Sequence, residues 1–297
     1  MNILLTGGTG LIGSGLTRLW QSQHKLWLLS RDPAKVTAMF GTAVQAISSL
    51  DEVDFNQLDA VINLAGEPIV GKRWTEQQKQ RLCDSRWQLT EQLVNAIKAA
   101  ASPPAVLISG SAIGVYGRHQ AQLITEDAAH YNPEFSHQLC QRWEDIALSA
   151  GSDRTRVCIL RTGIVLANDG GALTKMLPAF KLGLGGRISH GGQYMSWLHI
   201  SDMLSIIEFL LLHPTLSGIF NATAPNPVTN AEFSQTLAQV LKRPALLPMP
   251  AWLLQLMLGE MADLLLTGQR VLPANLTKAG FSFRYENLQP ALSALLD

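Results

Sequence analysis

A glycine-rich turn near the N-terminus is the feature that most constrains the fold of this 297-residue chain. An apolar run over residues 3–6 leads directly into Gly7, Gly10 and Gly13, and an amphipathic helix pattern follows. In a strand–turn–helix unit, glycines at this spacing permit a tight turn, let a pyrophosphate approach the backbone, and let helix and strand pack closely. The free N–H groups and positive dipole end of the helix favour phosphates. We therefore expect a dinucleotide cradle formed by Gly7, Thr9, Gly10, Leu11, Ile12 and Gly13.

Short apolar runs and helical patterns alternate through the first 165 residues. Trp87, Thr90, Val94 and Ile97 recur at the spacing of one helical face, and prolines at 103–104 end that pattern. Repeated strand–helix–strand units predict an α/β fold, a doubly wound parallel sheet with helices on both faces. The strands that we expect are Ile3–Thr6, Leu26–Ser30, Asp59–Ala65, Ala105–Ser111 and Arg156–Thr162.

The pattern changes after about residue 165, where glycine-rich loops separate apolar helices. We expect helices over 232–241 and 251–266, and a strand at Gly218–Ala222 that returns to the main sheet. The glycines within Pro178–Gly192 predict a flexible loop. The chain is therefore predicted to have two parts, a dinucleotide-binding domain over 1–165 and a smaller lobe on the substrate side over 166–297.

The end of the second strand indicates which cofactor is preferred. Ser30 and Arg31 stand there, eighteen residues beyond Gly13, where proteins specific for NAD usually carry an acidic residue. Arginine offers a planar, permanently charged group that suits a 2′-phosphate. We therefore expect NADP rather than NAD, with Ser30 and Arg31 at the cofactor; the alternative for Arg31 is a solvated surface side chain.

Composition excludes several classes of function. Lys and Arg together number 23, as do Asp and Glu, so no basic excess indicates a nucleic-acid partner. No apolar run reaches the roughly 20 residues that span a bilayer, and the first strand begins at about Asn2 without a signal peptide. The three cysteines are too scattered for a zinc cluster or a disulfide framework, and we predict no metal. We expect a cytoplasmic protein whose partners are small molecules or proteins and not membranes.

Segments spread over the whole chain carry a more specific signal. They are Thr6–Gly13, Asn63–Pro68, Lys72–Trp74, Ser85–Arg86, Ser109–Ala112, Leu160–Gly163, Leu182–Gly186, Trp197–Ile200 and Gly280–Phe283. Together they resemble the extended short-chain dehydrogenase/reductases, and among these the epimerase/dehydratase-like proteins of a bacterial epimerase family. The resemblance implies a Rossmann-like core, an NADP pocket and a C-terminal lobe that closes over a substrate cleft.

The same resemblance implies further cofactor contacts. Leu64, Ala65 and Gly66 would lie along the cofactor, with Ser109 and Thr162 at the ends of neighbouring strands. Arg86 would reach the phosphates, since a guanidinium bridges phosphate oxygens with two hydrogen bonds. The alternative for Arg86 is an ion pair on a helix surface.

Catalysis is where the sequence departs from the superfamily, whose enzymes use a Ser–Tyr–Lys set. Ser111 matches the serine, but none of the four tyrosines has a lysine four residues later. The segment that should carry the pair has Phe135 and Leu139 instead, and neither side chain can move a proton. The substitutes that we consider are Tyr116, which either projects into the cleft or packs as a buried aromatic side chain, and His199, three residues before Asp202. For His199 and Asp202 the alternative is a helix cap or a structural hydrogen bond, and Glu67 and Lys181 are weaker candidates.

Two kinds of function remain open. The first is an NADP-dependent oxidoreductase or epimerase for a small polar substrate, either free or nucleotide-linked, in which Ser111 would polarise a carbonyl or hydroxyl. The second is a non-catalytic NADP(H)-binding redox sensor, which the incomplete Tyr–Lys pair favours. A scaffold that binds no ligand is a third, weaker hypothesis. A homodimer is expected by analogy with such folds alone.

Overall fold

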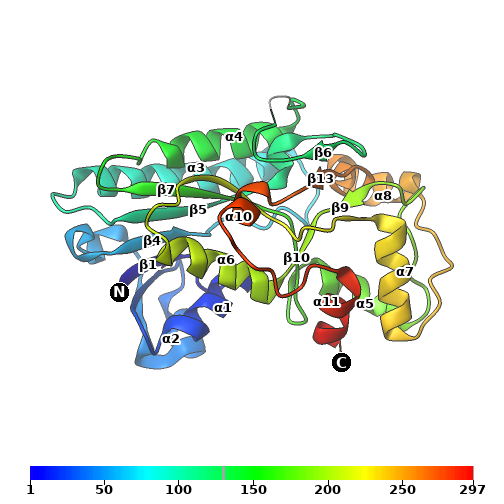
Figure 1. Cartoon of the computed structure of the whole chain (residues 1–297), viewed down its shortest axis with the longest axis horizontal. Coiled ribbons are helices and arrows are strands. Elements are labelled where there is room, and N and C mark those ends of the chain that lie inside the picture. Colours follow the sequence, from blue (N-terminus) through cyan, green and yellow to red (C-terminus); the bar gives the residue numbers. More distant parts are fainter. Residues whose placement is uncertain (129–130, 297) are drawn as a thin grey trace.

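The central layer of the molecule is a parallel β-sheet (Figure 1). The computed structural model describes residues 1–128 and 131–296. Seven strands pair in the order β11-β7-β5-β4-β1-β2-β3, and every pairing is parallel. The strands are β1 (Asn2–Thr6), β2 (Lys25–Leu29), β3 (Gln45–Ile47), β4 (Ala60–Asn63), β5 (Val106–Ala112), β7 (Arg156–Thr162) and β11 (Gly218–Ala222).

Helices cover both faces of this sheet (Figure 1). On one face, α3 (Glu76–Ala99) and α4 (Phe135–Leu148) pack on alternate side chains of the central strands. On the other face lie α1 (Leu11–Trp20), α2 (Pro33–Phe40) and α6 (Ile200–Leu212). Strands that are covered on both faces consist largely of consecutive apolar residues. This is why β1, β4 and β5 could be recognised in the sequence. The predicted doubly wound, Rossmann-like fold is confirmed.

The second half of the chain builds a smaller lobe beside the carboxyl ends of the strands (Figure 1). Short strand pairs lie within it and between it and the core: β8 with β10, β9 with β12, and β6 with β13. These strands are β6 (Leu123–Ile124), β8 (Ile164–Leu166), β9 (Tyr194–Met195), β10 (Trp197–His199), β12 (Val228–Thr229) and β13 (Arg270–Val271). The helices are α5 (Gly171–Lys181), α7 (Asn230–Leu241), α8 (Ala251–Leu258), α9 (Asp263–Leu266), α10 (Ala274–Lys278) and α11 (Leu288–Leu296).

Two predicted elements need correction. The helix expected over 251–266 is interrupted, because Gly259 ends α8 with φ of +60° and a 3₁₀ turn precedes α9. The loop expected from Pro178 begins later, since α5 continues to Lys181 with Pro178 inside it. The predicted strands agree with the structure to within one or two residues, and the three-residue β3 is an addition.

Residues beyond 165 also take part in the main layers. β11 pairs with β7 in register from Gly218 opposite Cys158 to Ala222 opposite Thr162. Helix α6 packs against α1 and β5, and its apolar side chains share one core with β1 and β4. The lobe and the core are therefore interleaved along the chain.

Candidate cofactor site and its surroundings

The glycine turn between β1 and α1 has no room for side chains. A Cβ on Gly13 would lie 2.2 Å from the carbonyl oxygen of Gly7, and one on Gly7 would lie 2.8 Å from that of Leu64. Gly7 also has φ of +71°, which favours glycine. Helix α1 begins at Leu11 without a side-chain cap at Gly10, so its first N–H groups are left for a ligand. The backbone geometry is that of a phosphate cradle.

The wall of this cradle is formed by the end of β4. The Thr6 hydroxyl donates to Asn63 at 2.8 Å and accepts the backbone N–H of Ala65 at 3.2 Å, while Leu64 N–H donates to the Thr6 carbonyl. Asn63 in turn donates to Thr90 at 2.9 Å, all within the core. This network fixes the segment 64–66 against the glycine turn. Sequence reasoning missed Thr6 and Asn63, although polar residues ending two neighbouring buried strands were a usable signal.

Arg31 extends from the end of β2 at the rim of the same turn. Its side chain is exposed and makes no hydrogen bond or ion pair with any residue in the described ranges. The Ser30 hydroxyl instead bonds within the turn, donating to the Asp32 carbonyl. Glu67 lies nearby: its hydrogen bond with Lys72 lowers the pKa of its carboxyl, and the charge of Arg31 adds to this. Arg31 is thus an unpaired cation beside the place where adenosine ribose binds in such folds.

Arg86 has a different environment from the predicted one. Its guanidinium donates to the carbonyl oxygens of Leu82 and Glu67, both at 3.0 Å, and to the Ser85 hydroxyl at 3.3 Å. Burial lowers the pKa of this guanidinium. These bonds anchor the loop after Gly66, whose Cβ would lie 2.9 Å from Arg86. A contact between Arg86 and cofactor phosphates stays a prediction, and the guanidinium is not in a surface ion pair.

Ser111 lies at the end of β5 in a buried charged cluster. Its hydroxyl donates to Glu144 of α4 at 2.5 Å, and Arg161 of β7 holds that carboxylate with two hydrogen bonds of 2.9 and 2.7 Å. None of the three side chains is more than 5% exposed. Since the single Ser111 proton is directed at Glu144, only lone pairs of this oxygen remain. The hypothesis that Ser111 polarises a carbonyl by donation is corrected on this ground.

Tyr116 does not project into a cleft. It belongs to the 3₁₀ turn Ile113–Tyr116, is fully buried, and donates its hydroxyl to Asn221 of β11 at 2.7 Å. Burial raises the pKa of the phenol to about 12. The guanidinium of Arg161 stacks 4.8 Å from its ring centre. The geometry makes Tyr116 a structural link between β5 and β11.

His199 and Asp202 do not form an acid–base pair. His199 is the N-cap of α6: its Nδ1 accepts the backbone N–H of Ser201 at 3.0 Å. The Asp202 carboxylate accepts the backbone N–H groups of Arg284 and Tyr285 at 2.8 and 3.0 Å. Burial lowers the pKa of His199 to about 4. The alternative of a cap and a structural hydrogen bond is the one that the structure shows.

Helix α4 presents a different pair of residues to Ser111 than the sequence suggests. Phe135 contacts Trp74 and Lys79, and Leu139 packs on α3, so both face away from the end of β5. Ser136 lies against Gly114, and Cys140 lies beside Ser111, with burial raising the pKa of its thiol to about 11. In neither register does α4 supply a tyrosine and a lysine.

Two hollows lie near the lobe. A cavity of about 410 Å³ separates α3 and α4 from the lobe, lined by Lys79, Phe135 and Glu260 among others. The lobe closes over it through ion pairs of Lys79 with Glu260 at 2.6 Å and Arg118 with Asp263 at 2.7 Å. None of the residues that line it belongs to the glycine turn or to the ends of β4 and β5.

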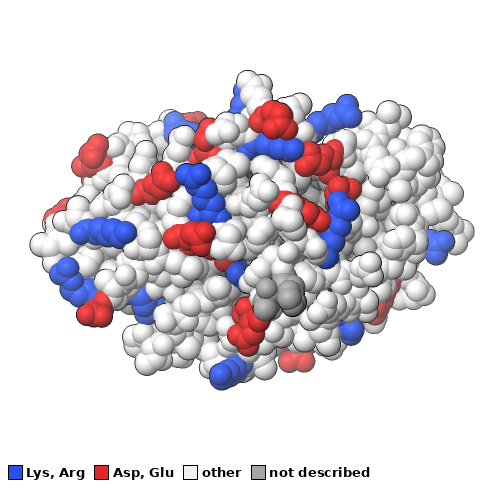
Figure 2. Space-filling view, turned by 90° about the horizontal axis from the view of Figure 1, so that it is seen from above, with Lys and Arg blue, Asp and Glu red and all other residues white. Residues whose placement is uncertain are grey.

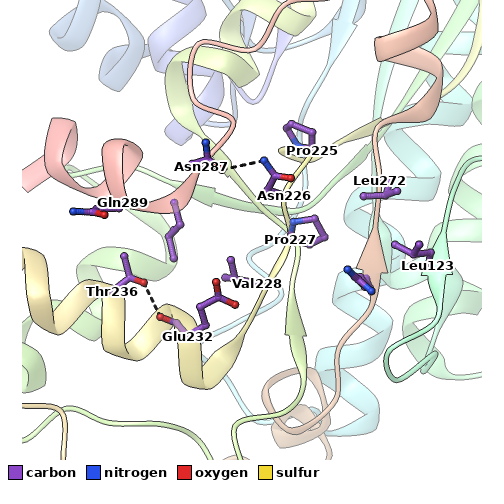
Figure 3. A pocket seen from close by; sticks show the side chains of 12 residues that line it. Leu123, Pro225, Asn226, Pro227, Val228, Glu232, Thr236, Leu272, Asn287 and Gln289 are labelled. Carbon is purple, nitrogen blue, oxygen red and sulfur yellow. Dashed lines mark hydrogen bonds between the residues drawn. The ribbon is translucent and has the colours of Figure 1, made fainter.

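The larger cavity, of about 530 Å³, lies within the lobe (Figure 3). It is bounded by the β11–β12 loop, α7, α11 and the β6–β13 pair. Asn226 donates to Asn287 across one side of it. None of its lining residues belongs to the glycine turn or to the end of β4, so it is separate from the cradle.

The predicted site residues are only partly brought together. The glycine turn, the end of β4 and Arg31 meet at the carboxyl edge of the sheet, while Thr162 ends β7 there. Ser109 is buried beneath this edge and accepts a hydrogen bond from Asn63 at 3.3 Å. Glu144, Arg161 and Asn221 decide what Ser111 and Tyr116 can do, and sequence reasoning named none of them as a site residue, although Arg161 lies in the segment Leu160–Gly163.

Comparison with known proteins identifies the family. The model of the NAD dependent epimerase/dehydratase family matches residues 3–222. The chain belongs to this family. Residues 249–295 match a domain of unknown function, DUF1731.

Relatives and a solved structure agree with this membership over at least 87% of their own length. The epimerase family protein YfhF of Bacillus subtilis is 37% identical, over 100% of this chain and 98% of its own. The chloroplastic SDR39U1 homolog of Arabidopsis thaliana is 36% identical, over 100% of this chain and 87% of its own. The crystal structure of human epimerase family protein SDR39U1 with NADPH superposes with a TM-score of 0.91 at 34% identity, covering 99% of both chains.

In the described part of the chain, no helix has both the length and the apolar character to span a membrane. The same residues hold no group of three or more His, Cys, Asp or Glu side chains arranged to bind a metal. The three cysteines are unpaired and buried.

Proposed function

We propose that this protein is an NADPH-dependent oxidoreductase that acts on a small polar substrate. The observation that carries the proposal is the unpaired Arg31 at the rim of a turn that has no room for side chains at Gly7 and Gly13. A free guanidinium matches a 2′-phosphate, which NADPH has and NADH lacks. The solved relative at 34% identity, human SDR39U1, was crystallised with NADPH, which supports the same cofactor here.

The residues around the cradle fit this cofactor. The bare glycine turn and the uncapped start of α1 suit the pyrophosphate, and the segment 64–66 lines the groove beside them. The nicotinamide ring supplies or accepts the hydride when the cofactor is bound. The protein's contribution is to bind, orient and exclude water.

Ser111 has a defined part in this proposal. Because Glu144 and Arg161 fix its proton, the Ser111 oxygen acts as a hydrogen-bond acceptor. A group that meets it must be a donor, so the ligand presents a hydroxyl or an amide N–H at this point. This favours an alcohol-bearing substrate or the hydroxyl-rich ribose of the cofactor over a bare carbonyl. The redox-sensor hypothesis gains no comparable support.

Calorimetric titration with NADPH and NADH tests the proposal. Arg31→Ala is expected to weaken NADPH binding by about ten- to a hundredfold, because it removes a charge-assisted hydrogen bond. NADH binding should change little. Arg81→Ala, which removes another exposed arginine on α3, is the matched control and should leave both affinities unchanged.

A substrate screen follows with the cofactor-bound protein. Cofactor absorbance would be followed with NADPH for carbonyl compounds, and with NADP⁺ for small alcohols and nucleotide-linked sugars, and turnover should fall in Ser111→Ala. No binding of either nucleotide would contradict the proposal at its base. Equal loss of NADPH and NADH binding in Arg31→Ala would show that Arg31 does not read the 2′-phosphate.

A further inference from the structure

An exposed apolar surface lies at the far end of the lobe, away from the cradle. It is formed by the loop after α5, the segment 243–250 and helix α8, and we call it the lobe-end surface. Each of its large apolar members exposes between 53 and 80% of its area. They are Leu182, Leu184, Leu246, Leu247, Trp252, Leu256 and Met257. Among the residues described, only Leu123 and Leu212 reach a similar exposure elsewhere.

These side chains belong to one continuous surface. The segments 182–189 and 243–250 run side by side: Met249 N–H donates to the Arg187 carbonyl, and Ser189 N–H donates to that of Met249. Gly186 packs against the backbone of Leu247. Helix α8 follows at once, with Trp252 and Leu256 one turn apart on its outer side and Leu254 buried on its inner side.

The area of this surface exceeds what a monomer normally exposes. Side chains of this size, each more than half exposed, amount to on the order of 800 Å². The largest apolar patch on a typical monomer is roughly 300–600 Å². The right-hand end of the molecule, where α8 lies in Figure 1, shows few charged side chains from above (Figure 2). An exposed apolar surface of this size is typical of a site that binds another molecule or a membrane.

The charges in these segments have a single sign. Lys181, Arg187, Lys242 and Arg243 are all exposed, while residues 181–189 and 242–258 contain no Asp or Glu. None of the four has an ion pair with another described residue. The chain as a whole is neutral, so this local excess is a property of the surface.

These charges discriminate between occupants. A second copy related by a two-fold axis would place four unpaired cations against the same four, which like-charge repulsion opposes. A protein partner would need about one hydrogen bond per 100–200 Å², yet Gln255 is the sole uncharged polar side chain in 242–258. Neither of the two cavities described above is lined by any of its protruding side chains.

We infer that the lobe-end surface docks onto an anionic lipid bilayer. An apolar helix that lies in the plane of the membrane interface, with an exposed tryptophan and flanking lysines and arginines, contacts both the acyl chains and the anionic head groups of such a bilayer. Trp252, Leu246 and Leu256 enter the boundary between head groups and acyl chains, and the four basic side chains contact anionic head groups. The protein is held at the membrane surface and does not cross it.

Vesicle flotation of the full chain tests this inference. The probes are vesicles of phosphatidylcholine alone and of an equal mixture of phosphatidylcholine and phosphatidylserine. Binding is expected to the mixed vesicles, to weaken with salt, and to be weak without phosphatidylserine. Leu246→Glu with Trp252→Glu should reduce binding at least tenfold. Lys242→Gln with Arg243→Gln should reduce it by about thirtyfold, from about fivefold for each charge.

The control and the contrary outcomes are distinct. Leu212→Glu, at a comparably exposed leucine on α6, should leave vesicle binding unchanged. Absence of binding to mixed vesicles would overturn the inference, and a dimer that dissociates in Leu246→Glu would assign the surface to a second copy. Vesicle binding that is unchanged by Lys242→Gln with Arg243→Gln would contradict the contact with anionic head groups. NADPH titration of the same variants should match the wild type, so this test does not depend on the proposed function.

Discussion

At Ser111, hydrogen bonding between side chains sets the chemistry that the site can offer. The hydroxyl donates to Glu144, and Arg161 holds the same carboxylate. Each partner of a buried ion pair of this kind compensates the charge of the other, and removing one leaves an uncompensated charge. A ligand at the end of β5 therefore meets a fixed acceptor where the superfamily has a serine beside a tyrosine and a lysine.

His199 gives a pH dependence of stability with a definite sign. Its Nδ1 accepts the Ser201 N–H, so protonation there would break the cap of α6, and burial sets the pKa near 4 against an ordinary 6.5. The unfolded chain thus takes up a proton first as the pH falls. The contribution of neutral His199 to the free energy of unfolding is complete above pH 6.5. It is lost as the pH falls toward 4, by on the order of 3 kcal/mol.

Denaturant unfolding across that pH window checks this expectation. His199→Asn keeps a side-chain acceptor at the N-cap but does not titrate. The difference in unfolding free energy between wild type and variant should shift in favour of the variant as the pH falls. A difference that stays constant with pH would show that His199 titrates normally.

Sequence alone gives the position of a residue on its own element but failed where its partner is distant. The position of Arg31 follows from its place eighteen residues after Gly13, and its contact with the cofactor stays a prediction. By contrast, Ser111 obtains its partner from 33 residues away and Tyr116 from 105 residues away. A motif gives the position of a side chain on its own element, but the direction of its hydrogen bond depends on which elements pack beside it.

At the scale of elements, the β1–α1 unit is specified by steric exclusion. Gly13 packs against the carbonyl of Gly7, a backbone atom that cannot move without the turn. A Cβ added at Gly15, two residues later in the same helix, would lie 3.0 Å from the flexible end of the Leu204 side chain. The two glycines therefore have different tolerance for a methyl group.

This difference predicts the outcome of two alanine substitutions. Gly13→Ala should displace the turn and abolish NADPH binding, because the added Cβ would lie 2.2 Å from the Gly7 carbonyl oxygen. Gly15→Ala should retain binding and gain up to about 1 kcal/mol of helix stability if Leu204 adjusts. Calorimetry and thermal unfolding measure both. Similar binding in the two variants would refute the steric account of the cradle.

Some elements could not be predicted from local pattern. The helix expected over 251–266 follows an apolar run that Gly259 divides, and the short β3 carries too few apolar residues to show a period. Helix α8 is apolar all round, a pattern that normally indicates burial. Only the fold shows that its outer side, with Trp252 and Leu256, stays exposed.

For the whole molecule, the order of strands in the sheet departs from a simple division at residue 165. The sheet edge next to β7 is closed by β11, and the face over β1 and β5 is covered by α6. Alternating strands and helices predicted the doubly wound layers correctly. The return of the strand Gly218–Ala222 to the sheet was also predicted, whereas the packing of α6 on α1 and β5 was not.

This interleaving predicts how fragments behave. The buried apolar side chains of α6 alone contribute on the order of 10 kcal/mol of gross burial, comparable with the net stability of an entire domain. The fragment 1–165 also lacks β11, so β7 becomes an open edge. We expect it to unfold without a cooperative transition and to bind no NADPH, whereas the full chain unfolds in a single one. Circular dichroism during thermal unfolding measures both, and adding fragment 166–297 should restore the transition. Cooperative unfolding and NADPH binding by 1–165 alone would instead establish an autonomous cofactor domain, with the lobe as a separable addition.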